Sequence, residues 1–305
     1  MNSILDQIDE PFSDSSSIPF FALCKKTKDY VTVALSGDGA DEIFSGYNKH
    51  SAEYRIQSLN SVEKFLLKFG ILSRYFSHSR ENKFSNFYRK VYKLWKISHY
   101  SLNDRYWKLA SFNSLKNINE ILKHDYDKTD YNVRRSMILS DLKLNDFNSI
   151  LITDQKLVLL NDMLRKVDSM SMANSLEVRV PFLDHKLVNY VNGLEARFKI
   201  SSRERKIILK KAFLSFLPNE ILNRPKKGFE LPLKSILTGD FLNQHKTLMS
   251  KEFILEQNIF NFNLISKMIR KFHSKNSGDS PYHIWNLIVF QNWYNKNSNK
   301  ILYEQ

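Results

Sequence analysis

The sequence of 305 residues has little cysteine, little glycine and no long apolar run, and each shortage excludes a class of protein. Its one cysteine, Cys24, cannot form an internal disulfide or build a zinc ribbon, which indicates a reducing compartment. No apolar stretch reaches the roughly 18–20 residues of a membrane helix, and residues 1–10 are too polar for a signal peptide. We therefore expect a cytoplasmic protein with no membrane partner.

Glycine is scarce as well, at 8 residues, against a usual share of about 7%. A chain with few sharp turns favours helices, and its 42% of hydrophobic residues suffices for one or two cores. The shortage also makes a cluster of glycines informative. Gly37, Gly39 and Gly46 lie close together in the sequence, so the first candidate site is expected there.

Basic residues outnumber acidic ones by 46 to 32, which gives a formal net charge of +14. Such an excess occurs in proteins that bind nucleic acid, where basic side chains gather into patches. Here the lysines are spread along the chain among asparagines, without a long polybasic block. We interpret the charge as a basic background, with an anionic small substrate as the alternative, and expect no nucleic-acid partner.

The residue pattern predicts an α/β fold that is mostly helical. Residues 18–28 have apolar residues at helical spacing, and residues 30–35 form a short β-branched apolar run typical of a buried strand. A glycine turn at 36–39 follows, and a helix is expected from Ala40. Strand, glycine turn and helix are half of a βαβ unit. No second strand is predicted, because helical periodicity prevails from Ala52 onward.

The turn Ser36–Glu42 is the strongest candidate for a site. Glycine lets the backbone approach a ligand, and the start of a helix offers unpaired N–H groups, an arrangement that favours phosphate. Asp38, Asp41 and Glu42 are spaced to share one helix face, where Mg²⁺ would bridge them to phosphate. Acidic residues also stabilise the first turn of a helix, so a structural role stays open. A Walker loop and a dinucleotide fingerprint are excluded, because the turn lacks their Lys-Ser/Thr ending and third glycine.

A second polar segment lies at 168–184. Glu177 and Arg179 stand in otherwise apolar surroundings, which predicts a buried ion pair because buried charges are costly unless paired. Asp184 is expected to cap a helix that begins at His185. These contacts serve either the scaffold or a site, and the sequence leaves both interpretations open.

A third segment, 224–229, combines three cations with a proline and a glycine. Arg224, Lys226 and Lys227 would form a basic loop that reaches a polyphosphate, although a solvated surface loop has the same composition. The histidines have no metal-ligand spacing, and no Gly-x-Ser-x-Gly motif occurs. A histidine-held metal site and a serine hydrolase therefore have no support.

Taken in order, four segments resemble the synthetase domain of the glutamine-hydrolysing asparagine synthetases. They are Asp9-Glu10-Pro11-Phe12, the run 33–47, the run 162–184 and Arg224-Pro225-Lys226-Lys227-Gly228-Phe229. The resemblance extends from residue 6 to residue 295, and β-lactam synthetase is a more distant relative of the same fold. It implies a parallel-sheet domain of the ATP-pyrophosphatase type, similar to the adenine nucleotide alpha hydrolases. Residues 1–50 would be a remnant of the nucleotide-binding core, and residues 51–305 the helical remainder.

The activity that the resemblance implies is the ATP-dependent conversion of aspartate to asparagine. Family members activate the side-chain carboxylate of aspartate with ATP and Mg²⁺, giving β-aspartyl-AMP and pyrophosphate. Ammonia, released from glutamine by a separate N-terminal domain, then attacks this intermediate. On this resemblance the chain is an ATP-dependent carbon–nitrogen ligase, with aspartate and ammonia as substrates and with ATP and Mg²⁺ as cofactors.

The resemblance also implies roles for five residues. Ser36 and Gly37 match the pair that contacts ATP. Asp38 matches an acidic residue tied to the acyl-adenylate, where many members have Glu, and Asp41 matches the aspartate associated with Mg²⁺ and pyrophosphate. Lys226 matches the lysine that stabilises charge developing on the phosphates. Asp38 and Lys226 are therefore the expected catalytic residues, and Asp41 is the expected metal ligand.

Two features of the family are absent from this sequence. Its glutaminase domains begin with Met-Cys, whereas position 2 here is Asn2, so glutamine hydrolysis by that route is not expected. The family's pyrophosphate loop, Ser-Gly-Gly-x-Asp-Ser, and the first strands of its sheet lie upstream of the Asp-Glu-Pro-Phe motif and do not occur here. Three interpretations follow: a fragment, half of a split enzyme whose partner chain supplies the loop and the glutaminase, or a non-catalytic descendant.

The substrate stays open within the family. Relatives of this type amidate other carboxylates, including those of sugar acids in surface polysaccharide assembly, and no residue identified above selects among them. A different class of protein, a non-catalytic basic helical binding protein, is the remaining alternative. A nucleic-acid binder of this charge would lose affinity steeply with salt, whereas the synthetase interpretation predicts no such binding.

Overall fold

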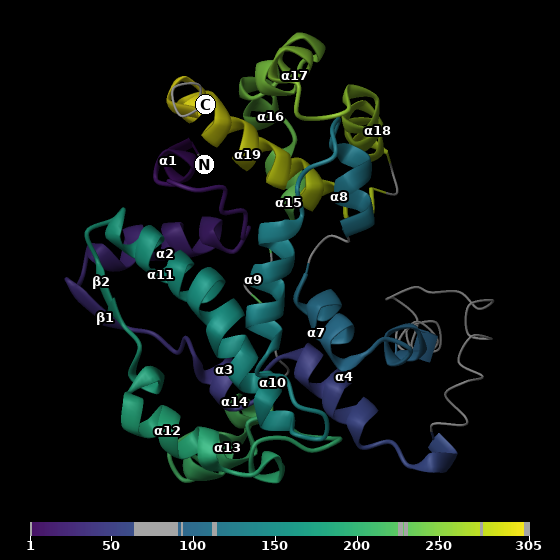
Figure 1. The fold of residues 1–305 in the computed structure, drawn as a ribbon. Helices are drawn as coiled ribbons and strands as arrows, with labels where there is room; N and C mark the ends of the chain where they lie inside the picture. The colour runs from purple at the N-terminus through teal and green to yellow at the C-terminus, as the bar shows by residue number, and fades with distance from the viewer. Residues whose placement is uncertain are drawn as a thin grey trace.

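The computed structural model describes residues 2–63, 91–92, 94–111, 115–224, 228, 231–274 and 277–301, and it is mostly helical (Figure 1). The helices before residue 173 are α1 (Asn2–Asp6), α2 (Ser17–Lys28), α3 (Ala40–Ile43), α4 (Asn48–Gln57), α7 (Leu102–Ala110), α8 (Leu115–Ile121), α9 (Thr129–Leu139), α10 (Phe147–Asp154) and α11 (Arg165–Met172). The later ones are α12 (His185–Gly193), α13 (Ile207–Ala212), α14 (Asn219–Leu222), α15 (Leu233–Leu237), α16 (Asp240–Gln244), α17 (Lys251–Gln257), α18 (Phe262–His273) and α19 (Ser280–Ile301). One π-helix and three 3-10 segments complete these elements: η2 (Gln155–Leu164), η3 (Pro181–Leu183), η4 (Ala196–Phe198) and η5 (Thr247–Met249).

Two short strands form a parallel sheet, β1 (Val33–Leu35) and β2 (Glu177–Arg179). They pair in register, with Ala34 opposite Val178. The sequence pattern did not predict β2, because charged residues flank its central valine and the run is too short to show a period. The predicted α/β class with mostly helical content agrees with this arrangement.

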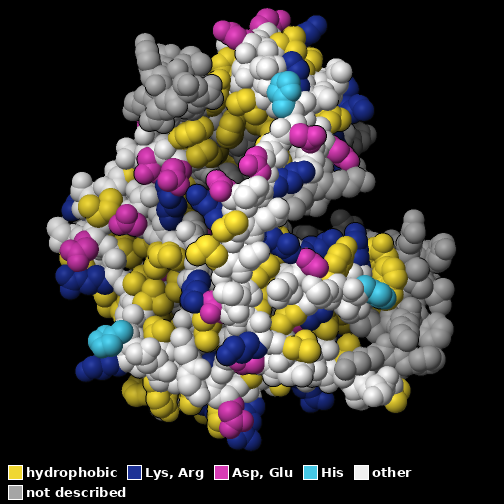
Figure 2. Space-filling view, viewed as in Figure 1, with side chains coloured by type: hydrophobic (Ala, Val, Ile, Leu, Met, Phe, Trp, Pro, Cys, Tyr) yellow, Lys and Arg dark blue, Asp and Glu magenta, His cyan; other side chains and the backbone are white. Residues whose placement is uncertain are grey.

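β1 is shorter and more exposed than the sequence predicts. Of the run 30–35 only Val33–Leu35 is a strand, and the exposed fraction is 38% for Val33 and 73% for Leu35. Strands of parallel sheets are normally buried on both faces. The prediction of a buried strand is therefore wrong for the described part of the chain, where β2 is the one strand that pairs with β1. Figure 2 shows hydrophobic side chains at the surface on the left of the view, the side where Figure 1 places the sheet.

The polar residues around β2 are paired but not buried. Nε of Arg179 lies 2.7 Å from Oε1 of Glu177, and both side chains are exposed. Alternate residues of a strand face the same side, so both charges point to one open face of the sheet. The predicted buried ion pair is thus corrected to an exposed one. The predicted cap is confirmed, because the carboxylate of Asp184 accepts hydrogen bonds from the backbone N–H groups of Lys186 and Leu187.

The largest apolar core lies among the C-terminal helices. Ile284, Trp285 and Ile288 of α19 are fully buried and pack with apolar residues of α15, α17 and α18. Figure 1 shows α1, at the N-terminus, beside α19. The indole Nε1 of Trp285 also donates to the carbonyl of Ser13 at 2.9 Å. The N-terminal segment is therefore held against this core.

A second feature that positions the site is the continuous helical run 147–172, which passes from α10 through η2 to α11 (Figure 1). Its middle part, η2, is a π-helix, a form that is rare and frequent at functional sites. α2 packs against α11. Cys24, on α2, is buried, and burial raises the pKa of its thiol to about 11. Among the described residues, no helix combines the length and apolar character needed to cross a membrane.

Candidate active site

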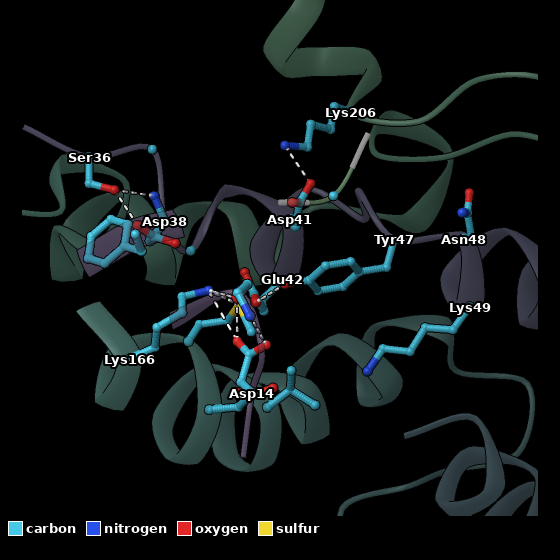
Figure 3. A pocket seen from close by; sticks show the side chains of 18 of the residues that line it. Asp14, Ser36, Asp38, Asp41, Glu42, Tyr47, Asn48, Lys49, Lys166 and Lys206 are labelled. Carbon is cyan, nitrogen blue, oxygen red and sulfur yellow. Dashed lines mark hydrogen bonds and ion pairs between the residues drawn. The ribbon is translucent and has the colours of Figure 1, made fainter. Parts of the chain in front are cut away.

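A cavity of about 1100 Å³ opens at the carboxyl end of β1 (Figure 3). Ligands of parallel α/β proteins bind at this end of the strands. Segments that are far apart in the sequence build the wall. They are the N-terminal segment with Asp14, Ser16, Phe20 and Leu23, the glycine turn 36–42, Tyr47 to Lys49, Val158 to Lys166, Lys206 and Gly228.

The glycine turn after β1 presents its backbone to the cavity. The N–H of Ser36 donates to the carbonyl of Arg179 at 2.8 Å, which ties the start of the turn to β2. The hydroxyl of Ser36 and the carboxylate of Asp38 are hydrogen-bonded to each other (Figure 3). Among the described residues, apart from the two neighbours in the chain, no atom lies within 4 Å of the position that a Cβ would take on Gly37. A ligand can therefore approach the backbone closely at this residue.

Gly39 closes the turn and requires glycine for two reasons. Its φ is 87°, and a Cβ there would lie 2.3 Å from Cδ2 of Leu183. The helix that follows, α3, is a single turn, so it does not provide the helix N-terminus that the sequence predicts for phosphate. Asp38 precedes α3 and does not share a helix face with Asp41, although both line the cavity. Phosphate contacts would come from the turn itself.

The two acidic residues of α3 have different partners. Asp41 forms an ion pair with Lys206, with 2.6 Å between Oδ1 and Nζ. Glu42 is almost fully buried and accepts a hydrogen bond from the hydroxyl of Tyr47 at 2.6 Å. Burial raises the pKa of Glu42, while the hydrogen bond from Tyr47 lowers it. Glu42 is therefore a structural acceptor for Tyr47 at the edge of the cavity.

Another part of the wall comes from the N-terminal segment and the helical run 147–172. Nζ of Lys166 lies 3.5 Å from the carboxylate of Asp14 and donates to the hydroxyl of Ser16 at 3.1 Å. Asp162, on η2, also lines the cavity. Burial, followed by the charge of Asp14, raises the pKa of Asp162 to about 7. This carboxyl therefore changes its protonation near neutral pH.

A buried network holds Lys49 at the cavity. Asp154 is fully buried and interacts with Nζ of Lys49 at 2.8 Å, Nε2 of His50 at 2.6 Å and the hydroxyl of Tyr106 at 2.6 Å. Burial lowers the pKa of His50, which favours the neutral ring. Burial alone would raise the pKa of Asp154, but the hydrogen bond from His50 and the charge of Lys49 keep it below its usual value. Lys49 thus stays ion-paired at the cavity wall.

The charges of the wall bear on which ligand it fits. In the described part of the chain, its acidic residues are Asp14, Asp38, Asp41, Glu42 and Asp162, against the amines Lys49, Lys166 and Lys206. Among the described residues, no group of three or more His, Cys, Asp or Glu side chains is arranged to hold a metal ion. Mg²⁺ is commonly held by one or two carboxylates together with substrate phosphates. These residues therefore fit Mg²⁺ that arrives with a phosphate ligand rather than a resident metal.

Four of the five predicted site residues lie together on this cavity. Ser36, Gly37, Asp38 and Asp41 all line it. Lys226 lies outside the described residues. Gly228, from the same predicted loop, is described and lines the cavity.

Sequence reasoning missed five charged residues that line the cavity together with this turn, namely Asp14, Lys49, Asp162, Lys166 and Lys206. One signal was available for two of them. Asp162 and Lys166, four residues apart, form an acid–base pair on one helix face, away from the apolar stripe formed by Leu157, Met163 and Val167. The others gave no local signal, because their place beside the turn depends on tertiary packing.

A small parallel sheet among helices, with a cavity at the carboxyl end of a strand, is typical of α/β proteins, which bind their ligands in this position. The family model described as asparagine synthase matches residues 1–295, and the chain belongs to this family.

Three curated relatives illustrate the similarity. Asparagine synthetase (glutamine-hydrolyzing) 1 of Bacillus subtilis (strain 168) is 27% identical over 97% of this chain and 45% of its own length. Asparagine synthetase (glutamine-hydrolyzing) 3 of the same organism is 29% identical over 71% of this chain and 28% of its own length. The asparagine synthetase (glutamine-hydrolyzing) of Gallus gallus is 34% identical over 33% of this chain and 19% of its own length. The chain thus spans less than half the length of these relatives.

Proposed function

We propose that this chain performs the synthetase part of asparagine formation, the ATP-dependent amidation of the side-chain carboxylate of aspartate. One observation carries the proposal: the open glycine turn at the end of β1 faces a cavity lined by carboxylates and amines, in a chain of the asparagine synthase family. The reaction forms β-aspartyl-AMP, which ammonia then attacks. Residues 1–50 would be the nucleotide-binding remnant of an ATP-pyrophosphatase-type domain, and residues 51–305 its helical remainder.

ATP is proposed to bind along the glycine turn. The backbone of Gly37 is open to the cavity, and the hydroxyl of Ser36 lies beside it, so both can donate to or accept from the nucleotide. Asp41 is the proposed carboxylate for Mg²⁺. Bound there with the phosphates, Mg²⁺ would supply positive charge where pyrophosphate leaves. Lys226 would add a second positive charge on the departing phosphates.

Attack by ammonia requires a group that orients it and accepts a proton. Asp38 is the proposed residue, since its carboxylate lies on the turn beside the proposed ATP contacts. Asp162 is a second proton acceptor in the same cavity, because a pKa of about 7 leaves a large fraction ionised at neutral pH. The ionised fraction can take the proton and the protonated fraction can return it.

A partner chain is proposed to complete the site. The backbone edge of β1 on the side away from β2 has no strand beside it among the described residues, and Leu35 is 73% exposed. An unpaired apolar strand is a ready template for a further strand. The relatives are more than twice as long as their match to this chain, which leaves room for a pyrophosphate loop and a glutaminase. We propose that these parts bind along this edge.

The test is the exchange of labelled pyrophosphate into ATP, which reports adenylation without the amidation step. We expect exchange that depends on aspartate when the chain is combined with a polypeptide that carries the pyrophosphate loop. The chain alone should bind Mg²⁺ and ATP weakly. Submicromolar ATP binding by the isolated chain in calorimetry would contradict the need for a partner. Exchange with a sugar acid but not with aspartate would contradict the proposed substrate.

A further inference from the structure

We propose that Lys206 is an internal counter-ion for Asp41, which occupies the place of a divalent cation and is displaced when the metal arrives. The inference rests on the proposed function only in taking Asp41 as the residue that meets the metal. It adds a residue with a defined task to the site.

The ion pair is seated tightly against the backbone of Gly46. Nζ of Lys206 lies 2.6 Å from Oδ1 of Asp41, and both side chains are largely shielded from solvent (Figure 3). A Cβ added to Gly46 would lie 1.7 Å from Oδ1 of Asp41 and 2.5 Å from Cε of Lys206. Glycine at this position therefore makes room for the pair. The ammonium stands directly on the carboxylate oxygen that a cation would use.

The backbone around Lys206 holds its ammonium group beside Asp41. Lys206 has a φ of 55°, in the left-handed region that is uncommon for residues other than glycine and is kept where the surroundings enforce it. The preceding residue, Arg205, fastens the segment, because its Nη1 donates to the carbonyl of Gly46 at 2.8 Å and to Oδ1 of Asn48 at 2.9 Å. The segment that carries the lysine is thus clamped to the loop after α3. Only the flexible side chain has to move when the amine leaves.

The charges of the cavity determine when the exchange occurs. The described residues offer no ready-made group of three metal ligands, so a free divalent ion gains few protein ligands and has to displace an ammonium from Asp41. A cation that arrives with phosphate brings its own oxygen ligands. The displaced ammonium, still in the cavity wall, then faces the phosphate. Lys206 therefore makes the site select a metal–phosphate pair over the metal alone.

The test uses the full chain and Mn²⁺ alone, followed by electron paramagnetic resonance of the free ion. Because no nucleotide is present, the result does not depend on the proposed reaction. Lys206→Met should bind Mn²⁺ about tenfold more tightly than the unmodified chain, since an opposing unit charge close to the carboxylate is removed. Lys206→Gly should give the same gain, because glycine accepts the left-handed backbone. The double variant K206M/D41N should lose the gain.

Lys210→Met is the matched control. Lys210 lies on α13, one turn from Lys206, and pairs with Glu204 at 3.3 Å, so its removal changes the net charge equally. It should leave the affinity for Mn²⁺ unchanged. An equal gain in K210M, a gain that persists in K206M/D41N, or no gain in both Lys206 variants would overturn the inference. Failure of the chain and its partner to catalyse pyrophosphate exchange would instead count against the proposed function, while the Mn²⁺ comparison would still decide this inference.

Discussion

The core around α19 and the sheet of β1 and β2 differ in how far their apolar side chains are buried. Trp285, at the centre of the first, is fully buried and its indole N–H is satisfied by Ser13. Leu35, the last residue of β1 in the second, is 73% exposed. Burying a large apolar side chain stabilises a fold by about 1.5–3 kcal/mol. The core around α19 is thus covered by the chain itself, whereas the sheet with the candidate site beside it offers a surface for something else to cover.

The largest effect on stability is expected for Trp285→Ala. The substitution leaves a cavity and an unpaired carbonyl at Ser13, and we expect a loss of about 3–5 kcal/mol in the free energy of unfolding. Urea unfolding followed by circular dichroism measures it. A loss below about 1 kcal/mol would contradict the view that this core holds the fold together.

Lys226→Ala tests the role proposed for this lysine in adenylation. We expect adenylation to fall at least about a hundredfold in the completed enzyme, because the developing phosphate charge loses a cation. We expect the fold to remain intact. The measurement is pyrophosphate release, with Lys227→Ala as the control of equal charge and near-normal rate. Release by K226A at the unmodified rate would refute the assignment.

Asp162→Asn probes the cavity wall through pH. The pKa of Asp162 is raised from 3.8 to about 7, so the folded state binds its proton more tightly than the unfolded state. The stabilisation is fully present below pH 3.8 and is lost as the pH rises through about 7. The asparagine variant cannot ionise at this position. Between pH 5 and pH 8 the free energy of unfolding should therefore fall in both proteins, but by about 1–2 kcal/mol less in the variant, after allowance for partial solvent access.

Urea unfolding at the two pH values tests this expectation. Asp168→Asn is the control, since this residue lies on the same helical run and is exposed. The same pH dependence in both variants would contradict a special environment at Asp162.

The smallest effect is expected for Leu35→Ala. An exposed side chain gives up little on truncation, and the isolated chain should change by less than about 0.5 kcal/mol in the same urea assay. Association with the proposed partner, measured by calorimetry, should weaken instead. A loss in the isolated chain as large as that of Trp285→Ala would show that the two regions do not differ.

The sequence predicted those elements whose signal lies within a few neighbouring residues. The helix expected at 18–28 is α2, the helix expected after the glycine turn is α3, and Asp184 caps α12. Three of the strand residues and the turn were found because β-branched residues and glycines are distinctive locally. Boundaries and burial were less predictable. The exposure of β1 depends on what packs beside it, and the sequence of a strand does not encode its neighbours.

The candidate site was predictable on one side only. Ser36, Gly37, Asp38 and Asp41 stand in one contiguous motif, and a resemblance to a known family pointed to them. Lys206 reaches Asp41 from a segment far along the chain, and its left-handed backbone has no marker in its residue type. Such contacts arise from tertiary packing, which no local periodicity reports.

The alkylation rate of Cys24, the single thiol of this chain, would report how often the wall of the candidate site opens. Cys24 lies next to Leu23, a cavity residue, on the helix that packs against α11, and its sulfur is shielded and protonated at neutral pH. Alkylation of the native protein therefore requires a local opening that moves α2 away from α11, and each modified molecule has undergone one such opening. A ligand that fills the cavity and holds α2 in place should therefore slow the alkylation of Cys24, without any mutation.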